Sequence, residues 1–127
     1  MALKTVRWRS KPQAKDFAAA SAYLGLILPQ RQASVIVAKF KRAKTIRELP
    51  KDIERASGLG LLTADDPEVA DKLKKLKKGE TLSPILLIRG RLSDGMRLTI
   101  ADGYHRVCAA YIVDQEADVP CRLVDLG

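Results

Sequence analysis

Residues 99–111 read TIADGYHRVCAAY, and the organisation of the chain follows from this stretch outward. Leading into it, Met96–Ile100 alternates apolar and polar side chains, which is the period of a half-buried strand. Asp102 and Gly103 form a turn dipeptide, and glycine adopts backbone angles that other residues resist. Apolar residues then recur at helical spacing, at Val107, Ala110, Tyr111 and Val113. The stretch therefore predicts a strand, a sharp turn and a helix that runs to about Val113.

The first turn of this predicted helix holds the only histidine of the chain, His105, and then Arg106. A helix N-terminus carries unpaired backbone N–H groups and a partial positive charge, so it favours anions. An imidazole adds a donor, and a guanidinium can bind a phosphate through two parallel hydrogen bonds. We therefore expect a phosphate or carboxylate site formed by Gly103, Tyr104, His105 and Arg106. The alternative is a turn without a ligand, in which His105 caps the turn and Arg106 pairs with Asp102 or Glu116.

The run Asp102-Gly103-Tyr104-His105-Arg106, between a strand and an alanine-rich helix, resembles the signature loop of the ParB/sulfiredoxin superfamily. Sulfiredoxins carry Gly-Gly-Cys-His-Arg there, free-serine kinases carry an Asp-Gly-His-His-Arg type of loop, and ParB partition proteins carry a Gly-Glu-Arg-Arg type. The resemblance extends to Asp66-Pro67 and to residues 83–88, and it covers residues 55–125. The whole chain is most similar to the small ParB-like proteins of bacteria, and its first fifty residues have no counterpart in the characterised branches.

This resemblance implies that the loop binds the phosphates of a nucleoside di- or triphosphate, with Mg²⁺ as a companion ion. It implies that Asp102 is a candidate catalytic residue for phosphotransfer or nucleotide hydrolysis, although a carboxylate that only caps the turn is the alternative. It also implies that lysines of the preceding helix, Lys72 and Lys75 among them, reach the phosphates, but lysines at the end of a helix also stabilise its dipole. Because Tyr104 stands where sulfiredoxins have their nucleophilic cysteine, we exclude sulfinic acid reduction.

The positive charge of the chain is concentrated in its first half. The net charge is +8, and residues 1–55 hold thirteen Lys and Arg against four Asp and Glu, a net charge of +9. Such asymmetry favours a polyanionic partner, DNA or RNA first. A non-enzymatic DNA-binding module is therefore the alternative function, with four candidate contacts on a basic helix: Lys39, Lys41, Arg42 and Lys44. The alternative is that these side chains contact only water, as the basic faces of many helices do.

The remaining patterns predict a small α+β domain of residues 1–127, in which 1–55 are a basic helical extension and 56–127 the core. We expect a mixed sheet of about four strands packed by helices, with two extra helices at the N-terminus. The expected strands are residues 59–62, 85–88, 96–100 and 119–124, and a polar hairpin spans 89–95. The expected helices are residues 16–28, 33–43, 50–55 and 67–78, followed by the one that ends near Val113.

Composition excludes several classes of protein. No apolar run approaches the ~20 residues of a membrane span, and no signal segment follows the basic N-terminus, so we expect a cytoplasmic protein without a membrane partner. One histidine and two cysteines do not provide a zinc site of ordinary spacing, so no metal site is expected within the protein itself. Cys108 and Cys121 are expected to be buried, reduced thiols. Trp8 is expected to fix the basic arm of residues 1–15 to the core, or else to lie on a phosphate backbone.

Overall fold

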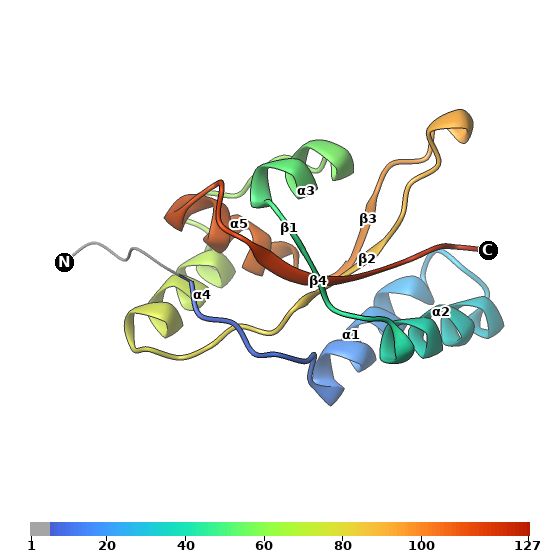
Figure 1. Cartoon of the computed structure of the whole chain (residues 1–127), viewed down its shortest axis with the longest axis horizontal. Helices are drawn as coiled ribbons and strands as arrows, with labels where there is room; N and C mark the ends of the chain where they lie inside the picture. Colours follow the sequence, from blue (N-terminus) through green and yellow to red (C-terminus); the bar gives the residue numbers. More distant parts are fainter. Residues whose placement is uncertain (1–5) are drawn as a thin grey trace.

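The computed structural model describes residues 6–127, so the first five residues of the basic arm, Lys4 included, lie outside the described part. Within that part the chain forms five α-helices, one short 3₁₀ helix and a sheet of four strands (Figure 1). The helices are α1 (Ala14–Leu24), α2 (Gln30–Arg42), α3 (Pro50–Ser57), α4 (Pro67–Lys77) and α5 (Tyr104–Val113), and the 3₁₀ helix is η1 (Leu92–Asp94). The strands are β1 (Ile46–Glu48), β2 (Ile85–Ile88), β3 (Thr99–Asp102) and β4 (Val119–Val124). These elements confirm the predicted α+β class.

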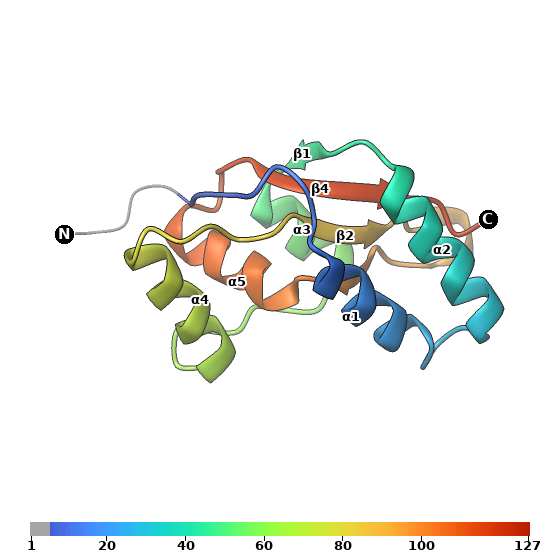
Figure 2. The same ribbon diagram turned by 90° about the horizontal axis from the view of Figure 1, so that it is seen from below.

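The sheet is open and mixed, with the strand order β1-β4-β2-β3. Strand β4 pairs antiparallel with β1 and parallel with β2, and β2 pairs antiparallel with β3. The last strand of the chain therefore lies inside the sheet, while β1 and β3 are its edges. Helices α1 and α2 lie below the strands and α3 above them in Figure 1, and Figure 2 shows α4 beside α5.

Strand β2 is the centre of the core, as its unbroken apolar sequence predicts. All four of its side chains are 2% exposed or less. Leu86 and Ile88 face α1 and α2, whereas Ile85 and Leu87 face α3 and α5. Each fully buried aliphatic side chain stabilises a fold by about 1.5–3 kcal/mol. The helices on both faces are therefore fixed through this one strand.

The two N-terminal helices form one side of the core. Leu24 of α1 and Phe40 of α2 are fully buried in the same cluster as the β2 side chains that face them. Arg122 of β4 strengthens the attachment, because its Nη1 donates to the carbonyl oxygens of Phe40 and Lys41 at 3.0 and 3.1 Å. A cation at this position also complements the negative end of the α2 dipole.

The structure differs from the predicted helix over residues 16–28 at both ends. The helix begins at Ala14, and Asp16 lies at its third position, where it accepts from the Gln13 N–H at 2.7 Å in a capping box. It ends at Leu24, because Gly25 follows and the next residues turn back onto the carbonyl of Leu24. The predicted start of this helix at Asp16 and its end before Pro29 are therefore wrong.

The fourth strand of the sheet comes from a different segment than expected. Residues 59–62 form a loop, since Gly58 and Gly60 have φ of 66° and 78° and interrupt an extended path. Its place is taken by β1, a three-residue edge strand whose side chains are all exposed, so no apolar alternation marks it in the sequence. Strand β3 also begins three residues later than predicted, at Thr99, because the Leu98 N–H donates to the carbonyl of Ala56 in α3 instead of to the sheet.

The predictions for the cysteines and for Trp8 are confirmed. Cys108 and Cys121 are free thiols, and both are fully buried. Burial raises the pKa of both thiols, that of Cys121 to about 12, so neither resembles an activated nucleophile. Trp8 pairs through its backbone with Leu82 and packs against the core, which fixes the arm from Val6 onward.

No helix within residues 6–127 combines the length and the apolar character that crossing a bilayer requires.

Candidate functional site

The loop between β3 and α5 has the backbone that its sequence predicts. Strand β3 ends at Asp102, Gly103 is the N-cap residue with φ of 109°, and α5 begins at Tyr104. A Cβ atom at Gly103 would lie 2.7 Å from Nη2 of Arg106 and 2.7 Å from Cδ1 of Ile85. Glycine is therefore required here twice, for the backbone angle and for the space.

Arg106 lies behind this loop in a buried ion-pair network. Its Nη2 donates to Oδ2 of Asp102 at 2.8 Å, and its Nη1 donates to Oδ1 of Asp16 at 3.0 Å. Nη2 also lies 3.4 Å from the carbonyl oxygen of Pro84, and Arg106 is only 9% exposed. The guanidinium thus joins α1, β3 and α5. In this arrangement it is occupied by two carboxylates rather than directed at a ligand.

The pKa values of the two carboxyl groups in this network are shifted in opposite directions. Burial alone would raise the pKa of Asp16, but the hydrogen bond from Gln13 and the charge of Arg106 hold it below its ordinary value of 3.8. Burial raises the pKa of Asp102 above the same ordinary value, and the nearby Asp16 adds to this, although Arg106 opposes it. Asp16 is therefore the firmly ionised partner of Arg106, and Asp102 is the weaker acid.

The Asp16→Asn variant tests this network through pH. A carboxyl whose pKa is lowered by folding stabilises the fold when it is ionised, and that contribution is lost as the pH falls through its folded-state pKa. We therefore expect the unchanged chain to be more stable than Asp16→Asn by about 1–3 kcal/mol near neutral pH. The difference should shrink as the pH falls below 3.8. Urea denaturation at a series of pH values measures it, and a difference that does not depend on pH would contradict the assignment.

The first turn of α5 is left without a side-chain cap. Gly103 has no side chain to accept from the N–H groups that follow it, whereas α4 is capped by Asp66, which accepts from Glu68 and Val69 at 2.9 and 3.0 Å. The backbone N–H groups of the first three α5 residues therefore have neither an intrahelical acceptor nor a side-chain cap. This helix end therefore has open backbone donors, and it lies beside a cavity.

That cavity has a volume of about 390 Å³ and lies between the loop and α1. Its lining includes Asp102 and the three residues that follow it, together with Tyr23 of α1 and Leu59. The His105 side chain is 38% exposed, and its Nε2 lies 4.0 Å from Oδ1 of Asp66. The Tyr104 hydroxyl donates to the carbonyl of Gly60 at 2.9 Å, which fixes the position of the ring. The cavity thus combines backbone donors and an imidazole with apolar walls.

The predicted lysine contacts lie on α4 rather than at this cavity. Lys72 and Lys75 both pair with Asp71 of the same helix, at 3.6 and 3.4 Å between nitrogen and oxygen. Neither is among the residues that line the cavity at the start of α5. Helix α4 packs directly against α5, so the lysines belong to a neighbouring element, but their ammonium groups are directed to a carboxylate.

The four basic residues proposed to contact nucleic acid differ in their contacts within the protein. The Lys39 ammonium donates to the carbonyl of Asp125 at 3.0 Å, and that of Lys41 lies 5.7 Å from the ring centroid of Phe17. Arg42 and Lys44 are exposed. Binding of DNA or RNA by this half of the chain stays a prediction.

Sequence reasoning missed two residues of this region, Asp16 and Tyr23. The sequence around Asp16 predicts only a helix cap, and Asp16 does take part in the capping box of α1. Nothing in that local sequence indicates that Asp16 contacts a loop 90 residues away. Tyr23 belongs to the apolar pattern of α1, and only the packing of that helix beside β3 brings it to the cavity. A comparison of the chain with protein-family models, with curated proteins and with solved structures finds no match.

Proposed function

We propose that the chain binds the phosphate group of a nucleotide, or of another small phosphorylated molecule, at the first turn of α5. The observation that carries the proposal is the uncapped start of this helix on a cavity of about 390 Å³. Three open backbone N–H groups and the helix dipole favour an anion there. The volume lies within the range of small-molecule sites, which begins at about 300 Å³.

Each residue of the loop has a distinct role in this proposal. The backbone of Gly103 and Tyr104 forms the cradle, and His105 adds a side-chain donor at its mouth. Arg106 acts indirectly, because its hydrogen bonds to Asp16 and Asp102 hold the loop from behind. Tyr23 and Tyr104 both line the cavity, and an aromatic ring there offers a surface on which a nucleobase can stack.

The proposal concerns binding and includes no catalytic step. Asp102, the candidate catalytic residue, gives one carboxylate oxygen to Arg106 at 2.8 Å. Within residues 6–127, no three or more His, Cys, Asp or Glu side chains are grouped so that they could hold a metal ion. Phosphotransfer or nucleotide hydrolysis through Asp102 and Mg²⁺ therefore remains what the sequence resemblance implies.

Titration with phosphate-containing ligands, followed by amide NMR, tests the proposal. The ligands are inorganic phosphate, ADP, ATP, CTP and GTP, each with and without Mg²⁺. We expect the amide signals of residues 103–107 to shift, and the His105→Ala variant to bind up to about tenfold more weakly because a hydrogen-bond donor is lost.

Lys78→Ala is the matched control, since it removes a positive charge from the far end of α4 and should leave the affinity unchanged. The partial restoration of binding by His105→Gln, which keeps a donor, would support a direct contact. If all five ligands leave residues 103–107 unshifted at millimolar concentration, the proposal is wrong.

A further inference from the structure

Two basic segments that lie far apart in the sequence are neighbours in the fold. One is the N-terminal arm, and the other is the end of α4. Within residues 6–127 their exposed cations make no ion pair with any carboxylate. We call this set the basic arm surface, and it consists of Arg7, Arg9, Lys11, Lys74, Lys77 and Lys78.

Backbone hydrogen bonds fix the arm beside the segment that leaves α4. The Leu82 N–H donates to the carbonyl of Arg7 at 2.9 Å, and the Arg9 N–H donates to the carbonyl of Leu82 at 2.8 Å. Leu82 is only four residues beyond Lys78, the residue that ends α4. Figures 1 and 2 both show the arm next to this segment. The cations of the arm therefore lie close to those at the end of α4.

The cations of each segment share a face. Trp8 packs against the core, and alternate residues of an extended segment lie on the same side, so Arg7 and Arg9 are both directed to solvent. On the helix, residues three and four positions apart are neighbours, which groups Lys74 with the two lysines that follow it in this set. Each segment thus presents a short row of positive charge.

A polar hollow continues the row along the arm. It has a volume of about 650 Å³, and its lining includes Arg9, Ser10, Lys11 and Thr81. Basic side chains together with hydroxyl groups are what contacts phosphate oxygens in complexes of proteins with nucleic acids. The hollow therefore offers both charge and hydrogen-bond donors to a phosphate.

The basic arm surface is almost free of carboxylates. Residues 7–13 and 74–82 together hold seven Lys and Arg against Glu80 alone, a net charge of +6. A field of one sign attracts a polyanion and raises the rate at which it associates.

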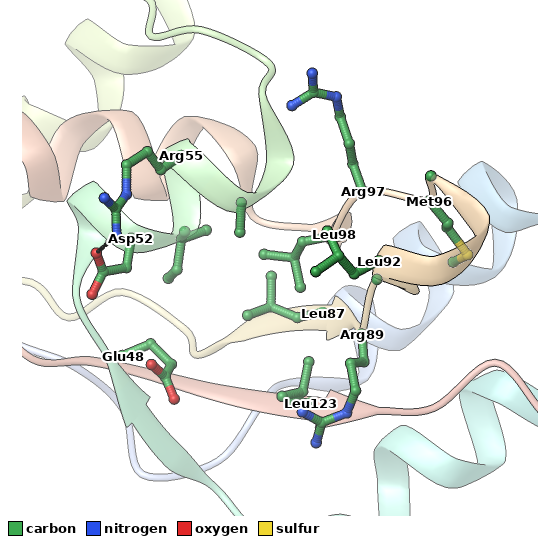
Figure 3. A pocket seen from close by; sticks show the side chains of 14 residues that line it. Glu48, Asp52, Arg55, Leu87, Arg89, Leu92, Met96, Arg97, Leu98 and Leu123 are labelled. Atoms are coloured by element: carbon green, nitrogen blue, oxygen red, sulfur yellow. Dashed lines mark hydrogen bonds and ion pairs between the residues drawn. The ribbon is translucent and has the colours of Figure 1, made fainter.

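The cavity between α3 and the hairpin that joins β2 to β3 differs in this respect. It has a volume of about 740 Å³, and both signs of charge lie around its apolar floor (Figure 3). Asp52 pairs there with Arg55 at 3.2 Å, and Arg89 pairs with Asp125 at 2.8 Å. Its charges are thus partly compensated within the protein, whereas those of the basic arm surface are not.

We propose that the basic arm surface binds the phosphodiester backbone of DNA or RNA, without regard to base sequence. Exposed cations without a partner can neutralise phosphates and release the counterions held there, which favours the complex. A surface that binds a membrane also carries large apolar side chains that enter the bilayer. In the described part of the chain, the exposed large apolar residues lie outside residues 7–13 and 74–82, so the surface fits a nucleic acid better than a lipid.

This interface differs from the one that the sequence favours on α2. A single sequence shows a basic first half, but only the fold brings the lysines of α4 next to the arm. The proposal also concerns a different ligand from that of the cavity at the start of α5, since a polymer of phosphodiesters replaces a small phosphate.

Fluorescence anisotropy of the whole chain with three labelled probes tests the proposal. The probes are single-stranded DNA, single-stranded RNA and duplex DNA, each without a terminal phosphate. We expect binding that weakens steeply between about 50 and 200 mM salt, because added salt opposes the release of counterions. The three probes show which of these backbones the surface prefers.

Two triple variants locate the interface. Each should weaken binding by about tenfold or more, because an exposed ion pair contributes up to about fivefold. Each should also lower the slope of log affinity against log salt concentration by about 2–3, nearly one for each lost phosphate contact. The arm variant combines Arg7→Gln, Arg9→Gln and Lys11→Gln, and the α4 variant combines Lys74→Gln, Lys77→Gln and Lys78→Gln.

A third triple variant is the matched control. Lys41→Gln, Arg42→Gln and Lys44→Gln remove the same charge from exposed positions at the end of α2. This variant should keep most of the affinity, since salt screens exposed charges over about 10 Å at 0.1 M.

The inference is wrong if no probe binds at low salt, or if the affinity does not depend on salt. It is also wrong if either the arm variant or the α4 variant binds as the unchanged chain does, or if the control loses as much affinity as they do. Polyglutamate or anionic lipid vesicles that compete as well as single-stranded DNA would point to another partner and contradict it. Inorganic phosphate should still shift residues 103–107 in the arm variant, which separates this result from that of the phosphate site.

Discussion

Arg106→Met should lower the free energy of unfolding by about 3–5 kcal/mol, because removing one partner of a buried ion pair leaves charge without compensation. Here the substitution would strand two carboxylates, those of Asp16 and Asp102, which receive hydrogen bonds at 3.0 and 2.8 Å. Because methionine fills a similar space, the loss of stability would come from the uncompensated charges and not from a cavity. Urea denaturation near neutral pH gives the value. In mild acid the loss should shrink, because carboxyls without a counter-ion take up protons more readily.

Arg55→Met is the matched control. Arg55 also pairs with an aspartate, at 3.2 Å from Asp52, but its side chain is 82% exposed. Exposed pairs contribute about 0.2–1 kcal/mol, so this variant should stay close to the unchanged chain. If Arg106→Met costs no more than Arg55→Met, the buried network does not hold the loop, and the indirect role given to Arg106 is wrong.

Gly103→Ala should lower the free energy of unfolding by about 2–4 kcal/mol, the sum of a strained backbone and a displaced neighbour. The φ of 109° is one that residues with a Cβ rarely adopt. The new methyl group would also lie 2.7 Å from Nη2 of Arg106, and the carboxylates of Asp16 and Asp102 hold this guanidinium in place. The substitution therefore disturbs the same ion-pair network of Arg106, Asp16 and Asp102, but by displacing Arg106 instead of removing it. Thermal unfolding and urea denaturation both measure the loss.

The Gly79→Ala variant separates the cost of the strained backbone from the cost of the displaced neighbour. Gly79 follows α4 with φ of 81°, and no atom lies within 4 Å of the position of its missing Cβ. This variant carries the backbone strain alone and should cost about 1 kcal/mol. Equal losses for the two glycine variants would show that the contact with Arg106 does not matter.

Much of the fold could be predicted because its signals are local. Asp66 and Pro67 mark the start of α4, the continuous apolar run marks β2, and the turn at Gly103 marks the start of α5. Each of these depends on residues within a few positions of one another, where spacing and propensity apply directly. For the same reason α2 is a helix: its buried residues Ala33, Ile36, Val37 and Phe40 keep helical spacing, although their composition favours a strand.

The candidate site could be predicted only in part, because its supports come from far along the chain. The loop and His105 follow from a short motif, and the structure places both at the edge of a cavity. The direction of the Arg106 side chain depends on Asp16, which is 90 residues away. Two charged residues at such a separation carry no mark of their pairing in a single sequence. The edge strand β1 was missed for a related reason, since it exists only through its pairing with β4.

The position of β4 has a consequence for how the chain folds during its synthesis. Strands β1, β2 and β3 are synthesised before β4. Strand β1 has no partner in the sheet until β4 pairs between it and β2. Arg122, which holds the end of α2, also emerges only with this strand. Until residues 119–124 have left the ribosome, the apolar run of β2 lacks one of its two neighbours and one side of the sheet cannot form. Exposed strand edges of this kind are where nascent chains aggregate. The nascent protein therefore depends on a late closing step, and a ribosome that stalls before residue 119 would leave a chain unable to complete its sheet.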